Sequence, residues 1–178
     1  RWAAATPRVQ NKRVVSRLTE VTGYPPVLLA GMTPGTVDPA IVAAAANAGY
    51  WAEVAGGGQH TLAQLEETLT TLKDQLDEGT SAQFNALYLD AKRWREQITG
   101  PRGIVYQRRA GAPVNGVGVS AGIPPREEAI ELVRRLQAAA IPWVAFKPGT
   151  ARHVETVLAL ADALPTQPII LQLEGGQA

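Results

Sequence analysis

The sequence contains no cysteine and only two histidines, His60 and His153, among its 178 residues. Without thiols, neither disulfide bonds nor thiolate metal sites can form. Two isolated histidines give no basis for a metal centre built from imidazoles. We therefore expect no bound metal, and any catalytic chemistry has to come from other side chains or from an organic cofactor.

A dominant sign of charge and long hydrophobic runs are also lacking. Seventeen basic residues balance sixteen acidic ones, which leaves a formal net charge of +1 and no basic field for nucleic acid or an anionic membrane. No apolar run approaches the roughly 18 residues that a membrane span needs. The first ten residues lack the apolar core of a signal peptide. We expect a cytoplasmic protein without nucleic-acid or membrane partners.

The composition is that of a globular protein, with 46% hydrophobic and 19% charged residues. A chain of this length can bury one sizeable core. The sequence begins with Arg1 and not with methionine, from which we expect a fragment of a longer polypeptide.

A strand, a loop and a helix follow one another repeatedly along the chain. Apolar runs predict six strands, at 27–30, 51–55, 82–89, 116–120, 143–146 and 168–173. Helical spacing predicts helices at 39–47, 61–76, 125–140 and 151–164, with a broken or late-starting helix in 90–110. Residues 1–26 form a lead-in segment with a short helix between Lys12 and Thr22.

Continuously apolar strands that alternate with helices indicate a parallel sheet buried on both faces. Such a sheet is either an open doubly wound one or a (β/α)8 barrel. The segment Gly31-Met32-Thr33-Pro34-Gly35 lacks the G-x-G-x-x-G pattern of the Rossmann fold, so we favour the barrel. The sequence thus predicts an α/β fold in which 27–178 form an incomplete TIM-type (β/α)8 barrel. Six units instead of eight would leave two open sheet edges.

Polar and glycine residues follow the predicted strands, and a barrel gathers all of these positions on one rim. Small residues would let a flat ring approach the backbone, Met32 would pack on its face, and Lys147 would place a positive charge where a reduced flavin becomes negative. These candidates for cofactor binding are Gly31, Met32, Thr33, Gly57, Asn85, Lys147, Gln172, Glu174 and Gly175.

Some of these residues also have a purely structural interpretation. The run Gly56-Gly57-Gly58 is equally typical of a tight turn, and His60 can simply begin a helix capped by Thr61. Asn85 and Lys147 are harder to explain in this way. A buried amide or ammonium group needs a partner or a ligand, because burial without one is costly.

Five motifs in this order resemble the enoyl-reductase domain of type I fatty acid synthases, as found in the fungal β chain and in the single-chain synthases of mycobacteria and corynebacteria. They are Pro26-Val27-Leu28-Leu29-Ala30-Gly31-Met32-Thr33-Pro34, Asn47-Ala48-Gly49-Tyr50, Glu53-Val54-Ala55-Gly56-Gly57-Gly58, Phe146-Lys147-Pro148-Gly149 and Leu171-Gln172-Leu173-Glu174-Gly175-Gly176. The resemblance implies a flavin-dependent TIM-type barrel that uses FMN and NADPH to reduce a trans-2-enoyl group on acyl carrier protein.

The same resemblance implies that Gly31, Met32 and Thr33 lie beside the flavin, with Asn85, Lys147, Gln172 and Glu174 around it. It implies as partners an acyl carrier protein domain and other synthase domains in a large homo-oligomer. The family's proton-donating histidine belongs to a Gly-Gly-His-His segment that would lie beyond Ala178, so the catalytic acid is not among these residues and the fragment alone is expected to be inactive. A nitronate monooxygenase-like flavoprotein and a catalytically silent structural fragment are the alternatives.

Overall fold

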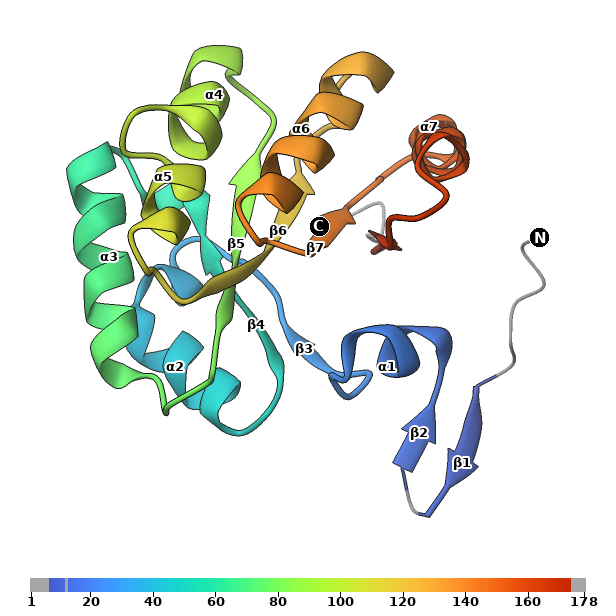
Figure 1. Cartoon of the computed structure of the whole chain (residues 1–178), viewed down its shortest axis with the longest axis horizontal. Coiled ribbons are helices and arrows are strands. Elements are labelled where there is room, and N and C mark those ends of the chain that lie inside the picture. Colours follow the sequence, from blue (N-terminus) through green and yellow to red (C-terminus); the bar gives the residue numbers. More distant parts are fainter. Residues whose placement is uncertain (1–6, 12, 174–178) are drawn as a thin grey trace.

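The computed structural model describes residues 7–11 and 13–173, and a six-stranded parallel sheet forms its centre (Figure 1). Glu174 and Gly175 lie outside the described residues. The strands are β3 (Leu28–Leu29), β4 (Trp51–Ala55), β5 (Ala82–Leu87), β6 (Val114–Ser120), β7 (Trp143–Phe146) and β8 (Ile169–Leu171).

The strands lie in the sheet in the same order as in the chain, β3-β4-β5-β6-β7-β8. A doubly wound sheet would reverse its strand order at a switch point, whereas a barrel keeps it. The helices that follow the strands form an arc around the outside of the curled sheet (Figure 1). The fold is therefore the predicted incomplete TIM-type barrel, a curled half-barrel of six strands, of which the first five are followed by helices in the described part of the chain.

The two outer strands leave the sheet open, as the sequence predicts. In the described part of the chain, β3 pairs only with β4, and β8 pairs only with β7. A groove beside β8 is lined by this strand, by α1 (Arg17–Thr22) and by the end of α7 (Ala151–Ala163).

The helices predicted to follow β3, β4, β6 and β7 are confirmed. They are α2 (Pro39–Asn47), α3 (Leu62–Gln75), α6 (Arg126–Ala138) and α7. Predicted strand ends at Leu89 and Leu173 run two residues too far, while β6 begins two residues earlier than predicted.

Residues 90–110 contain two helices, α4 (Ala91–Thr99) and α5 (Ile104–Arg109), so the predicted break is correct. The late start is wrong, because Asp90 caps α4 immediately after the strand. Its carboxylate accepts hydrogen bonds from the backbone N–H groups of Arg93 and Lys92, which hold the pKa of Asp90 below its ordinary value. The break follows from Pro101, because the residue before a proline avoids the helical conformation, and Gly100 is extended with a ψ of 169°. Gly100 and Gly103 are both glycines because an added Cβ would lie 2.4 and 2.6 Å from the carbonyl oxygen of Glu96.

The two faces of the sheet differ in polarity. Every second residue, among them Val54, Phe84 and Phe146, points to the helices and joins the apolar core with Leu65, Leu69, Leu72, Leu132, Val133 and Leu136. The alternate residues Glu53, Gln83, Asn85 and Lys147 are equally buried, on the inner face. The sequence predicts continuously apolar strands, but the folded strands carry a polar inner layer.

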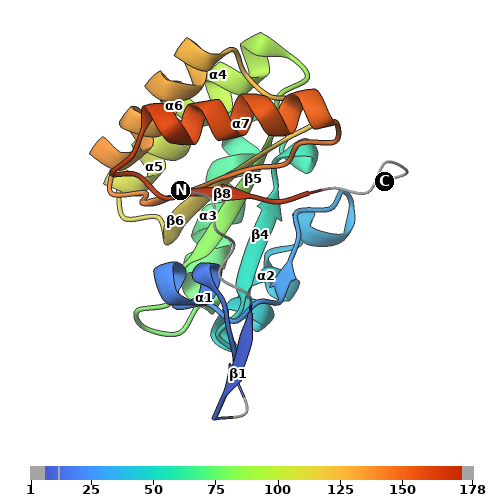
Figure 2. The same cartoon turned by 90° about the vertical axis from the view of Figure 1, so that its right-hand side faces the viewer.

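The lead-in segment folds differently from the prediction. Its helix is confirmed only as α1, and a hairpin of β1 (Arg8–Gln10) and β2 (Arg13–Val15) precedes it and projects from the barrel (Figures 1 and 2). The helix cannot begin earlier, because Ser16 forms a capping box with Thr19. Val14 and Val15 are β-branched, which favours the strand.

The part of the chain that the structure describes contains neither a candidate membrane-spanning helix nor a candidate metal-binding cluster. No helix in 7–11 and 13–173 is long and apolar enough to cross a membrane. No group of three or more histidine, aspartate or glutamate side chains within these ranges is arranged to hold a metal ion.

The capping box of α3 provides a first prediction. The Thr61 hydroxyl accepts from the N–H of Gln64, and the Gln64 side chain accepts from the N–H of Thr61. Thr61→Ala removes one half of this exchange and should lower the free energy of unfolding by about 1 kcal/mol. The control is Thr70→Ala, at an exposed position inside the same helix, which should be neutral or slightly stabilising because alanine is the better helix former. Urea unfolding of both variants tests this, and equal effects would contradict it.

Candidate functional site

The carboxylate of Glu53 is the centre of a buried polar cluster inside the half-barrel. Its Oε2 accepts hydrogen bonds from the backbone N–H of Gly31 at 2.8 Å and from Lys147 Nζ at 2.5 Å. Its Oε1 accepts from Trp51 Nε1 at 3.1 Å. The side chains of the ion pair are 0% and 1% exposed, so the two opposite charges compensate each other without solvent.

The ion pair spans the inside of the curled sheet. Glu53 lies on β4 and Lys147 directly follows β7, with β5 and β6 between these strands. Gly118 of β6 makes room for the pair. A Cβ at this position would lie 3.1 Å from Glu53 Oε1 and 3.4 Å from the Cε of Lys147, so the pair packs tightly against the glycine backbone.

Asn85 of β5 extends the cluster towards the loop that follows β3. Its Nδ2 donates to the carbonyl oxygen of Gly31 at 3.3 Å, and only 4% of the residue is exposed. A Cβ at Gly31 would lie 2.3 Å from the Cβ of Asn85, which explains the glycine by close approach. Asn85 Oδ1 is buried and has no hydrogen-bond partner among the described residues. A buried acceptor of this kind is expected to take a donor from outside the described residues.

The loops after β3 and β4 meet at the rim above this cluster. A Cβ at Gly57 would lie 2.8 Å from the Thr33 hydroxyl oxygen, so these two loops are in close contact. Met32 is 54% exposed beside them. On the other side, the N–H of Gln172 bonds the carbonyl oxygen of Phe146, the residue before Lys147.

The structure thus brings Gly31, Asn85 and Lys147 into one cluster and places Thr33 next to Gly57 at its rim. Lys147 has a protein partner, so its burial alone does not require a ligand. Glu53 was not among the site residues predicted from the sequence. The available signal was a lone carboxylate inside the apolar strand Trp51–Ala55, the same kind of signal that singled out Asn85.

The glycines after β4 form a one-turn helix, η2 (Gly56–Gly58), that α4 holds in place. Gln97 Nε2 donates to the carbonyl oxygens of Gly56 and Gln59 at 2.9 and 3.0 Å. A Cβ at Gly56 would lie 2.5 Å from the backbone oxygen of Asn85, so the turn needs a glycine there. His60 is exposed and its Nδ1 lies 3.0 Å from Arg93 Nη2. These contacts give the glycine run a structural role in the turn.

A second polar layer fills the amino end of the half-barrel. The hydroxyl of Tyr24, from the lead-in segment, accepts from Asn115 Nδ2 at 2.9 Å and from Gln83 Nε2 at 3.3 Å. The ring of Tyr24 packs edge to face on Trp51 at 5.5 Å. Trp51 in turn bonds Glu53, so the two layers are connected.

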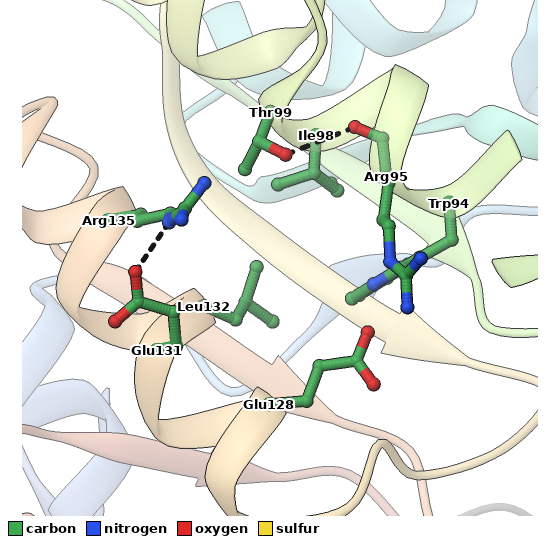
Figure 3. A pocket seen from close by; sticks show the side chains of 8 residues that line it. All are labelled: Trp94, Arg95, Ile98, Thr99, Glu128, Glu131, Leu132 and Arg135. Atoms are coloured by element: carbon green, nitrogen blue, oxygen red, sulfur yellow. Dashed lines mark hydrogen bonds and ion pairs between the residues drawn. The ribbon is translucent and has the colours of Figure 1, made fainter. Parts of the chain in front are cut away.

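A groove on the outer surface, between α4 and α6, is a separate place where a ligand could bind (Figure 3). Ile98 and Leu132 form its apolar part, and charged side chains surround it, with an ion pair of 2.6 Å between Arg135 and Glu131. Burial, and then the hydrogen bond to the carboxylate of Glu128, raise the pKa of Tyr88 beside it. None of the residues predicted for cofactor binding lines this groove.

The chain is similar to fungal fatty acid synthase β subunits. It is 37% identical over 163 residues to the fatty acid synthase β subunit aflB of Emericella nidulans, and the match covers 92% of this chain. It is 36% identical over 165 residues to the β subunit of Schizosaccharomyces pombe, and 33% identical over 166 residues to that of Saccharomyces cerevisiae. The chain spans only 7–8% of the length of these relatives. No protein-family model matches it.

A solved structure supports the fold independently. FabK from Thermotoga maritima, in its M276A mutant, superposes with a TM-score of 0.58 and 22% sequence identity. The match covers 80% of this chain and 43% of FabK. At this level of identity the similarity establishes the barrel fold alone.

Proposed function

We propose that this chain, a homologue of one segment of fungal fatty acid synthase β subunits, forms part of the enoyl-reductase site of a fatty acid synthase. The site would reduce a trans-2-enoyl group on an acyl carrier protein domain with NADPH, through FMN. The cluster of Gly31, Asn85 and Lys147 at the carboxyl edge of the barrel supports this proposal most directly, because barrel enzymes place their chemistry at this edge.

The residues of this edge fit a flavin. Asn85 Oδ1 is a buried acceptor without a partner in the described part of the chain, suited to an N–H group of a ring system. Gly31, Met32, Thr33 and Gly57 would approach the ring from the loops, with Asn85, Lys147 and Gln172 around it. Glu174 and Gly175 remain predictions from the sequence. Bound FMN would supply hydride transfer between NADPH and the β-carbon of the enoyl thioester.

The protein's contribution is electrostatic and positional. Negative charge grows on the thioester oxygen during reduction, and a buried ammonium group stabilises such charge more strongly than one in water. The Lys147–Glu53 pair is neutral as a whole, but the positive end of this dipole is at Nζ. Rigid support of Gly31 by Asn85 and Glu53 would keep the loop after β3 in one arrangement for the substrate.

The proposal is tested with the natural polypeptide that carries this segment. We expect it to oxidise NADPH when a trans-2-enoyl thioester is added, and to release FMN on denaturation. Oxygen uptake that depends on a nitronate, without enoyl reduction, would identify a nitronate monooxygenase instead. Failure to retain any flavin, with no reduction, would indicate a structural segment and would overturn the proposal.

A further inference from the structure

We infer that Glu53 is a positioning residue, whose carboxylate holds the Gly31 amide and the Lys147 ammonium group in one arrangement before any ligand binds. The inference deepens the proposed function and rests on it for the identity of the ligand. The contacts that carry it lie between residues of the chain itself and can be tested without the reaction.

The two donors that matter share a single oxygen atom. Glu53 Oε2 lies 2.8 Å from the Gly31 nitrogen and 2.5 Å from Lys147 Nζ. Because both donors bind the same oxygen atom, Glu53 Oε2 sets the distance between the Gly31 nitrogen and Lys147 Nζ. This oxygen thus connects a backbone group next to β3 with a side chain at the end of β7, and these two strands do not pair in the sheet.

Each partner needs this support. The ammonium group of lysine sits on a flexible four-carbon stem with many rotamers, and an ion pair selects one of them. Gly31 has no side chain of its own to anchor its loop. Its backbone is held on both sides of the Cα, at the nitrogen by Glu53 and at the carbonyl oxygen by Asn85. Glu53, Asn85 and Lys147 are buried and Gly31 is partly buried, which limits the access of water to these bonds.

The hydrogen-bond pattern requires a carboxylate and not an amide. Trp51 donates to Oε1, while Gly31 and Lys147 donate to Oε2, so both oxygens face donors. A glutamine would place its NH₂ group against one of these donors in either orientation. Glu53→Gln therefore changes almost no volume, yet it removes the charge and at least one of the bonds.

The test is hydrogen exchange of the Gly31 amide, measured by mass spectrometry on peptides of the ligand-free natural polypeptide. In Glu53→Gln, exchange should become about 10- to 100-fold faster, as expected for the loss of a hydrogen bond to a charged group. FMN retention should fall at least about tenfold, by the same conversion. Trp51→Phe serves as the matched variant, because it removes a donor from Oε1 only and should change exchange at Gly31 by less than about threefold.

If the Glu53→Gln variant does not fold, Glu53→Asp takes its place. The aspartate keeps the charge, but its carboxylate is withdrawn by one methylene, so exchange of the Gly31 amide should be faster than in the parent protein and slower than in Glu53→Gln. Glu131→Gln, in an exposed ion pair, controls for the loss of a carboxylate and should leave exchange at Gly31 unchanged. Unchanged exchange at Gly31 in both Glu53 variants would overturn the inference. If the parent polypeptide retains no flavin and reduces no enoyl thioester, while exchange is still faster in its Glu53 variants, the proposed function is overturned and the positioning role stays intact.

Discussion

Replacing Lys147 by methionine should lower the free energy of unfolding by about 3–5 kcal/mol, as measured when one partner of a buried ion pair is removed. Methionine keeps an unbranched side chain of similar length, so the volume changes little. What changes is the charge, because the fully buried Glu53 carboxylate would keep two donors but lose its positive partner. Urea unfolding of the variant and of the parent protein measures this loss.

A double-mutant cycle separates the ion pair from general damage to the core. Combining Lys147→Met with Glu53→Gln removes both charges, so the double variant should be more stable than the sum of the single losses predicts, by about 0.5–3 kcal/mol. Lys92→Met is the control, since its pair with Glu96 is exposed and should contribute less than about 1 kcal/mol. A Lys147→Met variant as mild as Lys92→Met would contradict the burial of this pair.

The same lysine variant bears on the proposed chemistry. If Lys147 also stands beside the flavin, then Lys147→Met in the natural polypeptide loses FMN affinity or reduction rate in addition to stability. Unchanged kinetics would remove Lys147 from the proposed site and leave it a structural role with Glu53.

The second large effect is expected for Gly31→Ala. The added methyl group would lie 2.3 Å from the Cβ of Asn85 and 2.7 Å from its Nδ2, so either the loop or β5 has to move. Overpacking of this kind costs about 1–3 kcal/mol. The shift would also weaken the hydrogen bonds of Gly31 to Glu53 and Asn85, so we expect FMN retention to fall with stability.

Gly35→Ala is the matched control for this substitution. Gly35 lies in the same loop and does not have a positive φ, and a methyl group added to it would meet no atom within 4 Å among the described residues. Its replacement should change the free energy of unfolding by less than about 0.5 kcal/mol, as is usual for surface substitutions. Thermal unfolding of both variants decides the matter, and equal destabilisation would mean that the contact of Gly31 with Asn85 is not tight.

Much of the barrel could be predicted because its units have strong local signals. The bounds of β4, α2 and β7 coincide with the prediction, since each begins or ends at a proline, a glycine or a capping residue next to an apolar run. The hairpin of β1 and β2 has no such signal. Its strands are three residues long and mostly exposed, so they show no alternation between a buried and a solvated face.

The site could be predicted only in part, for a different reason. Asn85 and Lys147 stand out in the sequence because a polar residue in or after an apolar strand requires an explanation. That the explanation for Lys147 is Glu53 depends on a contact between residues 94 positions apart, on strands that are not neighbours. Local spacing along the chain carries no information on such a contact, whereas the curvature of the sheet determines it.

Tyr24 has a practical consequence for anyone who excises or transplants this barrel. Its hydroxyl satisfies the amides of Gln83 and Asn115, and its ring covers Trp51. A recombinant protein that begins at β3 would lack Tyr24, and water would then reach the amides at the amino end of the half-barrel. A recombinant protein that begins before α1 retains Tyr24 and keeps this end closed.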